Sequence, residues 1–186
     1  MVPVTTLWLP ILLSAVVVFV VSSIIHMVFT YHRTDFVKIP DEEQVRKALG
    51  AVDIPPGDYV IPHSSSQAER KTSEFLEKVN AGPVAFMTVM PKGMPAMGGQ
   101  LVQWFVYCIV VSVFAAYIAG RALDAGAPYL AVFRFAGATA FAGYALALLQ
   151  NSIWYKRSWS GTLKSVFDGL VYAAATAGTF GWLWPS

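Results

Sequence analysis

Residues 7–29, LWLPILLSAVVVFVVSSIIHMVF, form an apolar run of 23 residues that contains no Asp, Glu, Lys or Arg. At the rise of an α-helix this run is about 34 Å long, enough to cross a hydrocarbon core of roughly 30 Å. Basic residues follow the run and none precedes it, which argues against a cleavable signal peptide. The stretch is therefore predicted to be a membrane-spanning helix.

Three further apolar runs have a similar length. They cover Leu101–Gly120, Tyr129–Leu149 and Ser165–Trp184. Backbone N–H and C=O groups in lipid must pair within their own segment, so all four runs are expected to be helices. The predicted fold is an all-α integral membrane protein with four transmembrane helices.

The composition of the chain supports this class. Of its 186 residues 56% are hydrophobic and only 13% are charged, which excludes a disordered chain and an ordinary cytosolic enzyme. The single cysteine, Cys108, excludes an intrachain disulfide framework. A net charge of +2 without any basic run argues against nucleic acid as a partner, and the lipid bilayer is the expected one.

The runs divide the chain into three regions. Residues 1–31 hold the first helix, 32–99 form an insert of 68 residues, and 100–186 hold three helices. The insert contains seven of the eleven prolines and is predicted to be loop-rich. Its expected elements are a helix over Pro40–Leu49 ending at Gly50, an extended loop over Ile54–Ser66, a helix over Ser73–Asn80, and a strand or interfacial stretch over Val84–Met90.

Basic residues near the membrane predict the orientation. Eight flank one side and two flank the other, which by the positive-inside rule places both termini in the periplasm and residues 32–99 in the cytoplasm of a bacterial cell. The eight are Arg33, Lys38, Arg46, Lys47, Lys92, Lys156, Arg157 and Lys164, and the two are Arg121 and Arg134. The predicted location is thus the bacterial inner membrane.

Small residues recur at four-residue spacing on three of the predicted helices, a pattern typical of close helix packing in membranes. The predicted packing residues are Gly169, Ala173, Ala177 and Gly181; Ser112, Ala116 and Gly120; and Thr139, Gly143 and Ala147. Sequence leaves open whether these faces meet within one chain, in self-association or with other membrane subunits.

Few polar residues lie inside the predicted helices. Arg134 is interpreted as reaching for the outer headgroups, and Asp168 as the partner of Lys164 one turn earlier. His26 lies in the last turn of the first helix, and continued helical spacing puts it on a different face from His32. Arg134, Asp168 and His26 are the candidate intramembrane polar residues, with an ion or substrate path as the alternative function.

Four methionines, Met87, Met90, Met94 and Met97, lie close together in sequence. Thioethers suit Cu(I), so these residues and His26 are weak metal candidates, against an apolar packing role. No nucleotide-binding loop, zinc-protease motif or nucleophile elbow occurs. No catalytic residue and no cofactor is predicted, and an enzymatic role is not indicated.

The stretches GPVAFMTVMPKGMPAMG, GAPYLAVFRFAGATAFAGYALAL and NSIWYKRSW…FDGLVYAAATAGTFGWLWP resemble an uncharacterised family of small bacterial four-helix integral membrane proteins. The resemblance implies an inner-membrane location and supplies no activity. The first functional hypothesis is a non-catalytic accessory or scaffolding subunit of a larger membrane assembly. The alternatives are a small transporter or channel component, and a membrane protein that binds a metal or a tetrapyrrole.

Overall fold

The structure is a computed structural model that describes all of residues 1–186. It is mostly helical, with one two-stranded sheet, and divides into two units. The helix bundle comprises Met1–Val37 and Ala96–Ser186, and the insert comprises Lys38–Pro95. Each unit is described by itself.

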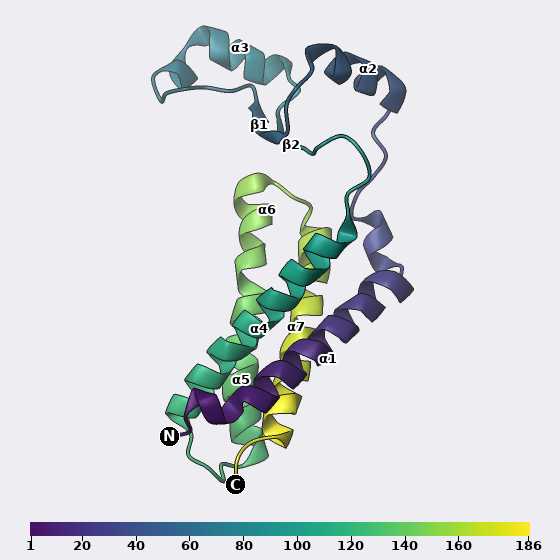
Figure 1. The fold of residues 1–186 in the computed structure, drawn as a ribbon. Helices are drawn as coiled ribbons and strands as arrows, with labels where there is room; N and C mark the ends of the chain where they lie inside the picture. Colours follow the sequence, from purple (N-terminus) through teal and green to yellow (C-terminus); the bar gives the residue numbers. More distant parts are fainter. The chain divides into compact units, whose positions relative to one another are not determined.

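The bundle contains four long helical stretches (Figure 1). Its elements are η1 (Val4–Leu7), α1 (Trp8–Val28), η2 (Tyr31–Thr34), α4 (Met97–Ala122), α5 (Tyr129–Tyr144), η4 (Leu146–Leu148), α6 (Leu149–Tyr155) and α7 (Trp159–Trp182). Three stretches are long and apolar enough to cross a membrane: Val4–Val28, Met97–Ala122 and Tyr129–Tyr155. The first three predicted spans are therefore confirmed as helical stretches long and apolar enough to cross a membrane.

Each of the four helices α1, α4, α5 and α7 packs against two of the others. Helix α1 contacts α4 and α7, and α5 contacts the same two helices from the opposite side. One core cluster includes Val18, Cys108 and Tyr172, and a second includes Leu7 and Phe180. Each cluster draws on helices distant in sequence, so the bundle is held by long-range contacts.

Helix α7 is not among the stretches apolar enough to count as a span. It carries polar residues at buried positions, among them Asp168 and Thr176, and the Thr176 hydroxyl donates to the Tyr172 carbonyl at 3.0 Å. The face of α7 that packs against its neighbours can hold such residues, because their polar groups pair inside the protein. This explains why α7 is less apolar than the helices around it.

The third predicted helix is interrupted. Helix α5 ends at Tyr144, Ala145 leaves the helical region with φ −125° and ψ −47°, and the chain continues through η4 into α6. The prediction of one uninterrupted helix over Tyr129–Leu149 is therefore wrong at this point. The break lies at a close approach of α7, since a Cβ added to Gly169 would be 2.8 Å from the Ala145 Cβ.

The small residues of α7 lie at its contact with α5. A Cβ at Gly181 would come within 2.6 Å of the Tyr129 ring. Ala173 and Ala177, which lie between Gly169 and Gly181 in the sequence, are buried. Close packing of this kind needs glycine or alanine at the contact. The α5–α7 contact lies within one chain.

The other two predicted packing faces differ from each other. Ser112 and Ala116 of α4 are fully buried, and Gly120 lies against the Val2 carbonyl. On α5, by contrast, the register Thr139, Gly143 and Ala147 is wrong as a single face, because Gly143 contacts Val111 of α4 while Ala147 is exposed. The buried residues of α5 are Val132, Ala136, Ala140 and Tyr144.

Both termini lie at the end of the bundle that carries the α4–α5 loop (Figure 1). The Val2 N–H donates to the Gly120 carbonyl at 2.8 Å, and the Gly126 N–H donates to the Pro185 carbonyl at 2.8 Å. The amino group of Met1 also pairs with Asp124. These contacts hold both ends of the chain against the last turn of α4 and the α4–α5 loop.

The insert contains two short helices and a two-stranded antiparallel sheet. Its elements are α2 (Glu42–Val52), β1 (Gly57–Ile61), η3 (Glu69–Lys71), α3 (Ser73–Ala81) and β2 (Ala85–Val89). Strands β1 and β2 pair antiparallel, with Tyr59 opposite Met87. The prediction of a loop over residues 57–61 is wrong, because these residues pair with the stretch predicted as a possible strand.

The ends of the predicted Pro40–Leu49 helix differ from prediction, whereas α3 begins at Ser73 as predicted and ends one residue later, at Ala81. Helix α2 continues past Gly50 to Val52 and ends at Asp53, which has a left-handed backbone conformation. The N-cap of α3 is Thr72, whose side chain accepts the Phe75 N–H. No residue of Lys38–Pro95 is buried. The insert therefore consists of local elements without a core.

Candidate metal centre

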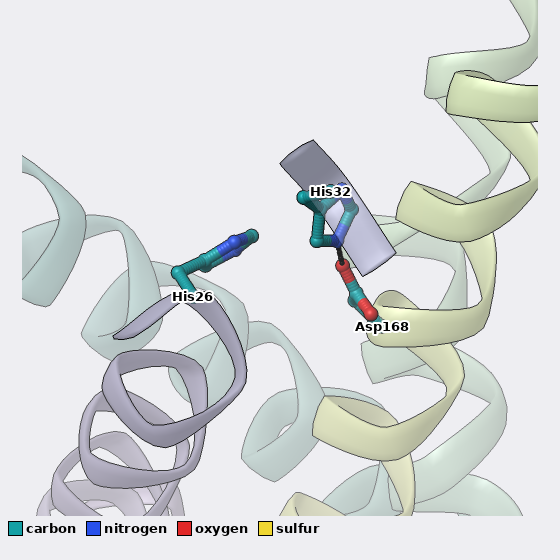
Figure 2. Close-up of side chains that lie close together, drawn as sticks. All are labelled: His26, His32 and Asp168. Carbon is teal, nitrogen blue, oxygen red and sulfur yellow. Dashed lines mark hydrogen bonds and ion pairs between the residues drawn. The ribbon is translucent and has the colours of Figure 1, made fainter. Parts of the chain in front are cut away.

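A polar cluster lies where α1 ends and η2 meets α7. After Val28 the chain leaves the helix through Phe29, whose backbone is extended, and η2 then carries its side chains toward α7. Figure 2 shows His26 at the end of α1, His32 on η2 and Asp168 on α7. Residues separated by more than 130 positions in sequence thus share one site.

Asp168 is the buried anion of the cluster, with 4% of its side chain exposed. One carboxylate oxygen accepts a hydrogen bond from the Tyr31 hydroxyl, and the other lies 2.7 Å from His32 Nε2. Burial, followed by the nearby carboxylates, raises the pKa of Tyr31, so its hydroxyl remains protonated and can donate. A buried carboxylate needs such partners to offset its lost hydration.

His32 is held between two carboxylates. Its Nδ1 lies 2.6 Å from Asp35 and its Nε2 contacts Asp168. Burial of the imidazole lowers its pKa, but the hydrogen bonds to Asp35 and Asp168 outweigh this effect, and the net pKa is raised. These contacts favour the imidazolium form, which donates to both carboxylates.

Lys164 anchors η2 to α7. Its Nζ donates to the Tyr31 carbonyl at 2.7 Å, to Thr34 Oγ1 at 2.9 Å and to Asp35 Oδ1 at 2.8 Å. The hydrogen bond from Lys164, followed by that from His32, lowers the pKa of Asp35. The predicted Lys164–Asp168 pair is therefore wrong, because each residue pairs with η2 instead.

His26 faces this cluster from the end of α1. Its ring centroid lies 4.9 Å from that of His32, and its Nε2 lies 3.5 Å from the Tyr172 hydroxyl. Continued helical spacing predicts the two histidines on different faces. That prediction is wrong because the helix ends at Val28 and the chain turns before reaching His32.

His26, His32 and Asp168 together have the composition of a metal site. One ligand atom from each lies within 4.8 Å of the others. Two imidazoles and a carboxylate occur in both catalytic zinc sites and non-haem iron sites, which keep open coordination positions. Asp35 on His32 Nδ1 provides the outer hydrogen bond that orients a ligating imidazole.

The other predicted polar residues lie elsewhere. Arg134 is exposed on α5. It lies eleven residues before Ala145, the contact of Gly169, so about 16 Å of helix separates it from the level of Asp168. The two candidates for an ion path are therefore not brought together.

The methionines do not form a cluster comparable to this one. Met90, Met94 and Met97 are exposed, by 73%, 96% and 63% respectively, and Met87 is half-buried in β2. Sequence reasoning assigned the metal candidates mainly to these residues and missed His32 and Asp35. The signal that could have found them is the density of titratable residues in Tyr31–Asp35 directly after a membrane helix.

Known proteins supply no further assignment for this cluster, because no protein-family model, no curated protein and no solved structure matches the chain.

Proposed function

We propose that this chain is a multi-pass membrane protein that binds a divalent transition-metal ion through His26, His32 and Asp168. The observation that carries the proposal is the convergence of two imidazoles and a buried carboxylate from three separate segments, with ligand atoms within 4.8 Å. Asp35 and Tyr31 hold two of these ligands by hydrogen bonds.

Metal binding would replace the proton between His32 and Asp168. An ion bound at about 2.0–2.2 Å to both atoms separates tetrahedral ligands by roughly 3.3 Å, and the present 2.7 Å needs only a small opening. His26 is exposed, and its contacts are the His32 ring at 4.9 Å between centroids and the Tyr172 hydroxyl at 3.5 Å, so its imidazole has room to turn toward the ion. Two nitrogens and one oxygen favour Zn²⁺, Fe²⁺ or Co²⁺ over Mg²⁺ or Ca²⁺.

The proposal includes four membrane crossings, with α7 as the fourth. Helix α7 has 24 residues, about 36 Å, and it contacts α5 from Tyr129 to Ala145. A helix packed along the full length of a spanning neighbour spans with it. Both termini then lie on one side, and the excess of basic residues assigns residues 32–99 to the cytoplasmic side of a bacterial inner membrane.

The proposal is tested by Co²⁺ titration of the detergent-purified chain, with the visible d–d spectrum reporting coordination. The wild type should bind one ion per chain, and His26→Gln should weaken binding by at least about tenfold. His63→Gln, in the insert, is the matched control and should bind as the wild type does. Binding should weaken from about pH 8 to about pH 6, because a ligating imidazole must lose its proton.

Absence of a Co²⁺ spectrum in the wild type would overturn the proposal. An equal loss of affinity in His26→Gln and His63→Gln would do the same, because it would assign the signal to histidines in general.

A second candidate function is that of an accessory or scaffolding subunit. The observation that favours it is the insert, in which no residue is buried and the large side chains of Val84 and Phe86 are more than half exposed. Such a segment gains stability by covering apolar surface with a partner chain. Crosslinking from a photoreactive residue at position 86 in intact cells should give a discrete heavier product, and a lone monomer counts against this role.

A further inference from the structure

An apolar groove lies beside the cluster, on an exposed outer face of the bundle. Its volume is about 390 Å³, and its walls come from α1 between Val21 and Phe29 and from α7 at Phe167 and Val171. Ile24, Phe29 and Phe167 are 46%, 54% and 58% exposed, so the groove is open laterally. Most of its α1 wall belongs to the stretch Val4–Val28, which is able to cross the membrane.

The groove and the polar cluster share a wall. Tyr31 lines the groove with its ring, while its hydroxyl donates to Asp168. Ile25 in the groove directly precedes His26, and Phe167 directly precedes Asp168. A hydrocarbon chain lying in the groove would therefore place its polar end at the two imidazoles and the carboxylate.

The net charge of the metal-loaded cluster favours an anionic group at the polar end of such a hydrocarbon chain. Asp35 and Asp168 are negative and Lys164 is positive, so a divalent ion with neutral imidazoles leaves one net positive charge. The metal also has open coordination positions, for which an anionic oxygen is a good ligand. The exposed Arg33 of η2 adds a further positive charge nearby.

We propose that the ligand of this centre is an anionic phospholipid that enters from the bilayer, with an acyl chain in the α1–α7 groove and a phosphate oxygen on the metal. This inference rests on the proposed metal site and names its ligand class. An acyl chain fits because the groove is apolar and opens to lipid, where water cannot fill it. The phosphate fits because it is an oxygen anion at a positively charged site.

The test compares Co²⁺-loaded protein in nanodiscs of dioleoyl-phosphatidylglycerol with protein in nanodiscs of dioleoyl-phosphatidylcholine. The wild type should show a change in the d–d spectrum with the anionic lipid, and native mass spectrometry should detect at least one retained phosphatidylglycerol. Ile24→Trp, which fills the groove, should lose both effects while still binding Co²⁺ in dodecylmaltoside. Ile118→Trp is the matched control, because Ile118 of α4 is exposed to a similar degree, 41%.

Val171→Phe provides a second groove-filling variant should Ile24→Trp fold poorly. If Ile24→Trp or Val171→Phe keeps the lipid-dependent spectrum and the retained lipid, the lipid proposal is overturned while the metal site stands. The lipid proposal is also overturned if soluble glycerol 3-phosphate in dodecylmaltoside reproduces the spectral change, because the acyl chain would then be irrelevant. Failure of the wild type to bind Co²⁺ in detergent overturns the metal site instead.

Discussion

The bundle and the insert keep their structure in different ways. In the bundle, side chains from distant segments meet, and even a carboxylate such as Asp168 is buried among partners. In the insert, the elements rest on local hydrogen bonds and one pair of strands, and no side chain is buried. A substitution in the bundle should therefore affect the whole unit, whereas the same chemical change in the insert should remain local.

The largest effect is expected from Asp168→Ala. It leaves the Tyr31 hydroxyl and the His32 imidazolium without their buried partner, which should lower the free energy of unfolding by about 3–5 kcal/mol. Asp58→Ala is the matched change in the insert, where an exposed carboxylate accepts from Thr88 Oγ1 at 2.6 Å. Its expected cost is below about 1 kcal/mol, because water can replace the lost partner.

Thermal unfolding in dodecylmaltoside, followed by circular dichroism, measures both variants. Equal midpoints for Asp168→Ala and Asp58→Ala would remove the basis of the comparison, because burial of the carboxylate would then have no consequence.

Sequence predicted the helices far better than the site. Long apolar runs such as 7–29 determine helices in lipid by themselves, because backbone groups there can pair only within the segment. The cluster depends instead on where the α1 helix ends. After Val28 the chain turns and places His32 against Asp168 of α7. The assumption that helical spacing continues from His26 to His32 therefore predicts the wrong face for His32.

The helix contacts were predictable in part for a related reason. A register of small residues shows which positions permit close approach, and on α7 these positions do meet α5 at Gly169 and Gly181. It does not show which neighbour lies opposite. On α5 the register through Gly143 faces Val111 of α4 instead, a choice set by the whole bundle.

A smaller but definite effect is expected from Gly181→Ala in the bundle. The added Cβ would lie 2.6 Å from the Tyr129 ring, so either this ring must shift or helices α5 and α7 must move apart, at a cost of about 1–3 kcal/mol. Gly50→Ala in the insert meets nothing within 4 Å and lies inside α2, where alanine should stabilise the helix by about 0.5–1 kcal/mol.

The two glycine variants thus carry opposite signs. The thermal midpoint of the bundle measures the first, and amide hydrogen exchange in α2 measures the second. An unchanged or higher thermal midpoint of the bundle in Gly181→Ala would show that the Tyr129 contact leaves room for a methyl group, contrary to the close contact at this position.

The smallest effect concerns the N-cap hydrogen bond of a helix, of which each region has one example. Thr72 caps α3 by accepting the Phe75 N–H at 3.3 Å, and Ser158 caps α7 by accepting the Gly161 N–H at 3.1 Å. Replacing either residue by alanine removes the acceptor and should cost about 1 kcal/mol.

Thr72→Ala should speed amide exchange in α3 alone and leave the bundle midpoint unchanged, because α3 has no buried contacts. Ser158→Ala should lower the bundle midpoint and leave α3 exchange as it was, since α7 packs against both α1 and α5. If Thr72→Ala lowered the bundle midpoint as much as Ser158→Ala does, the insert would be coupled to the bundle, and the two regions would unfold as one cooperative unit.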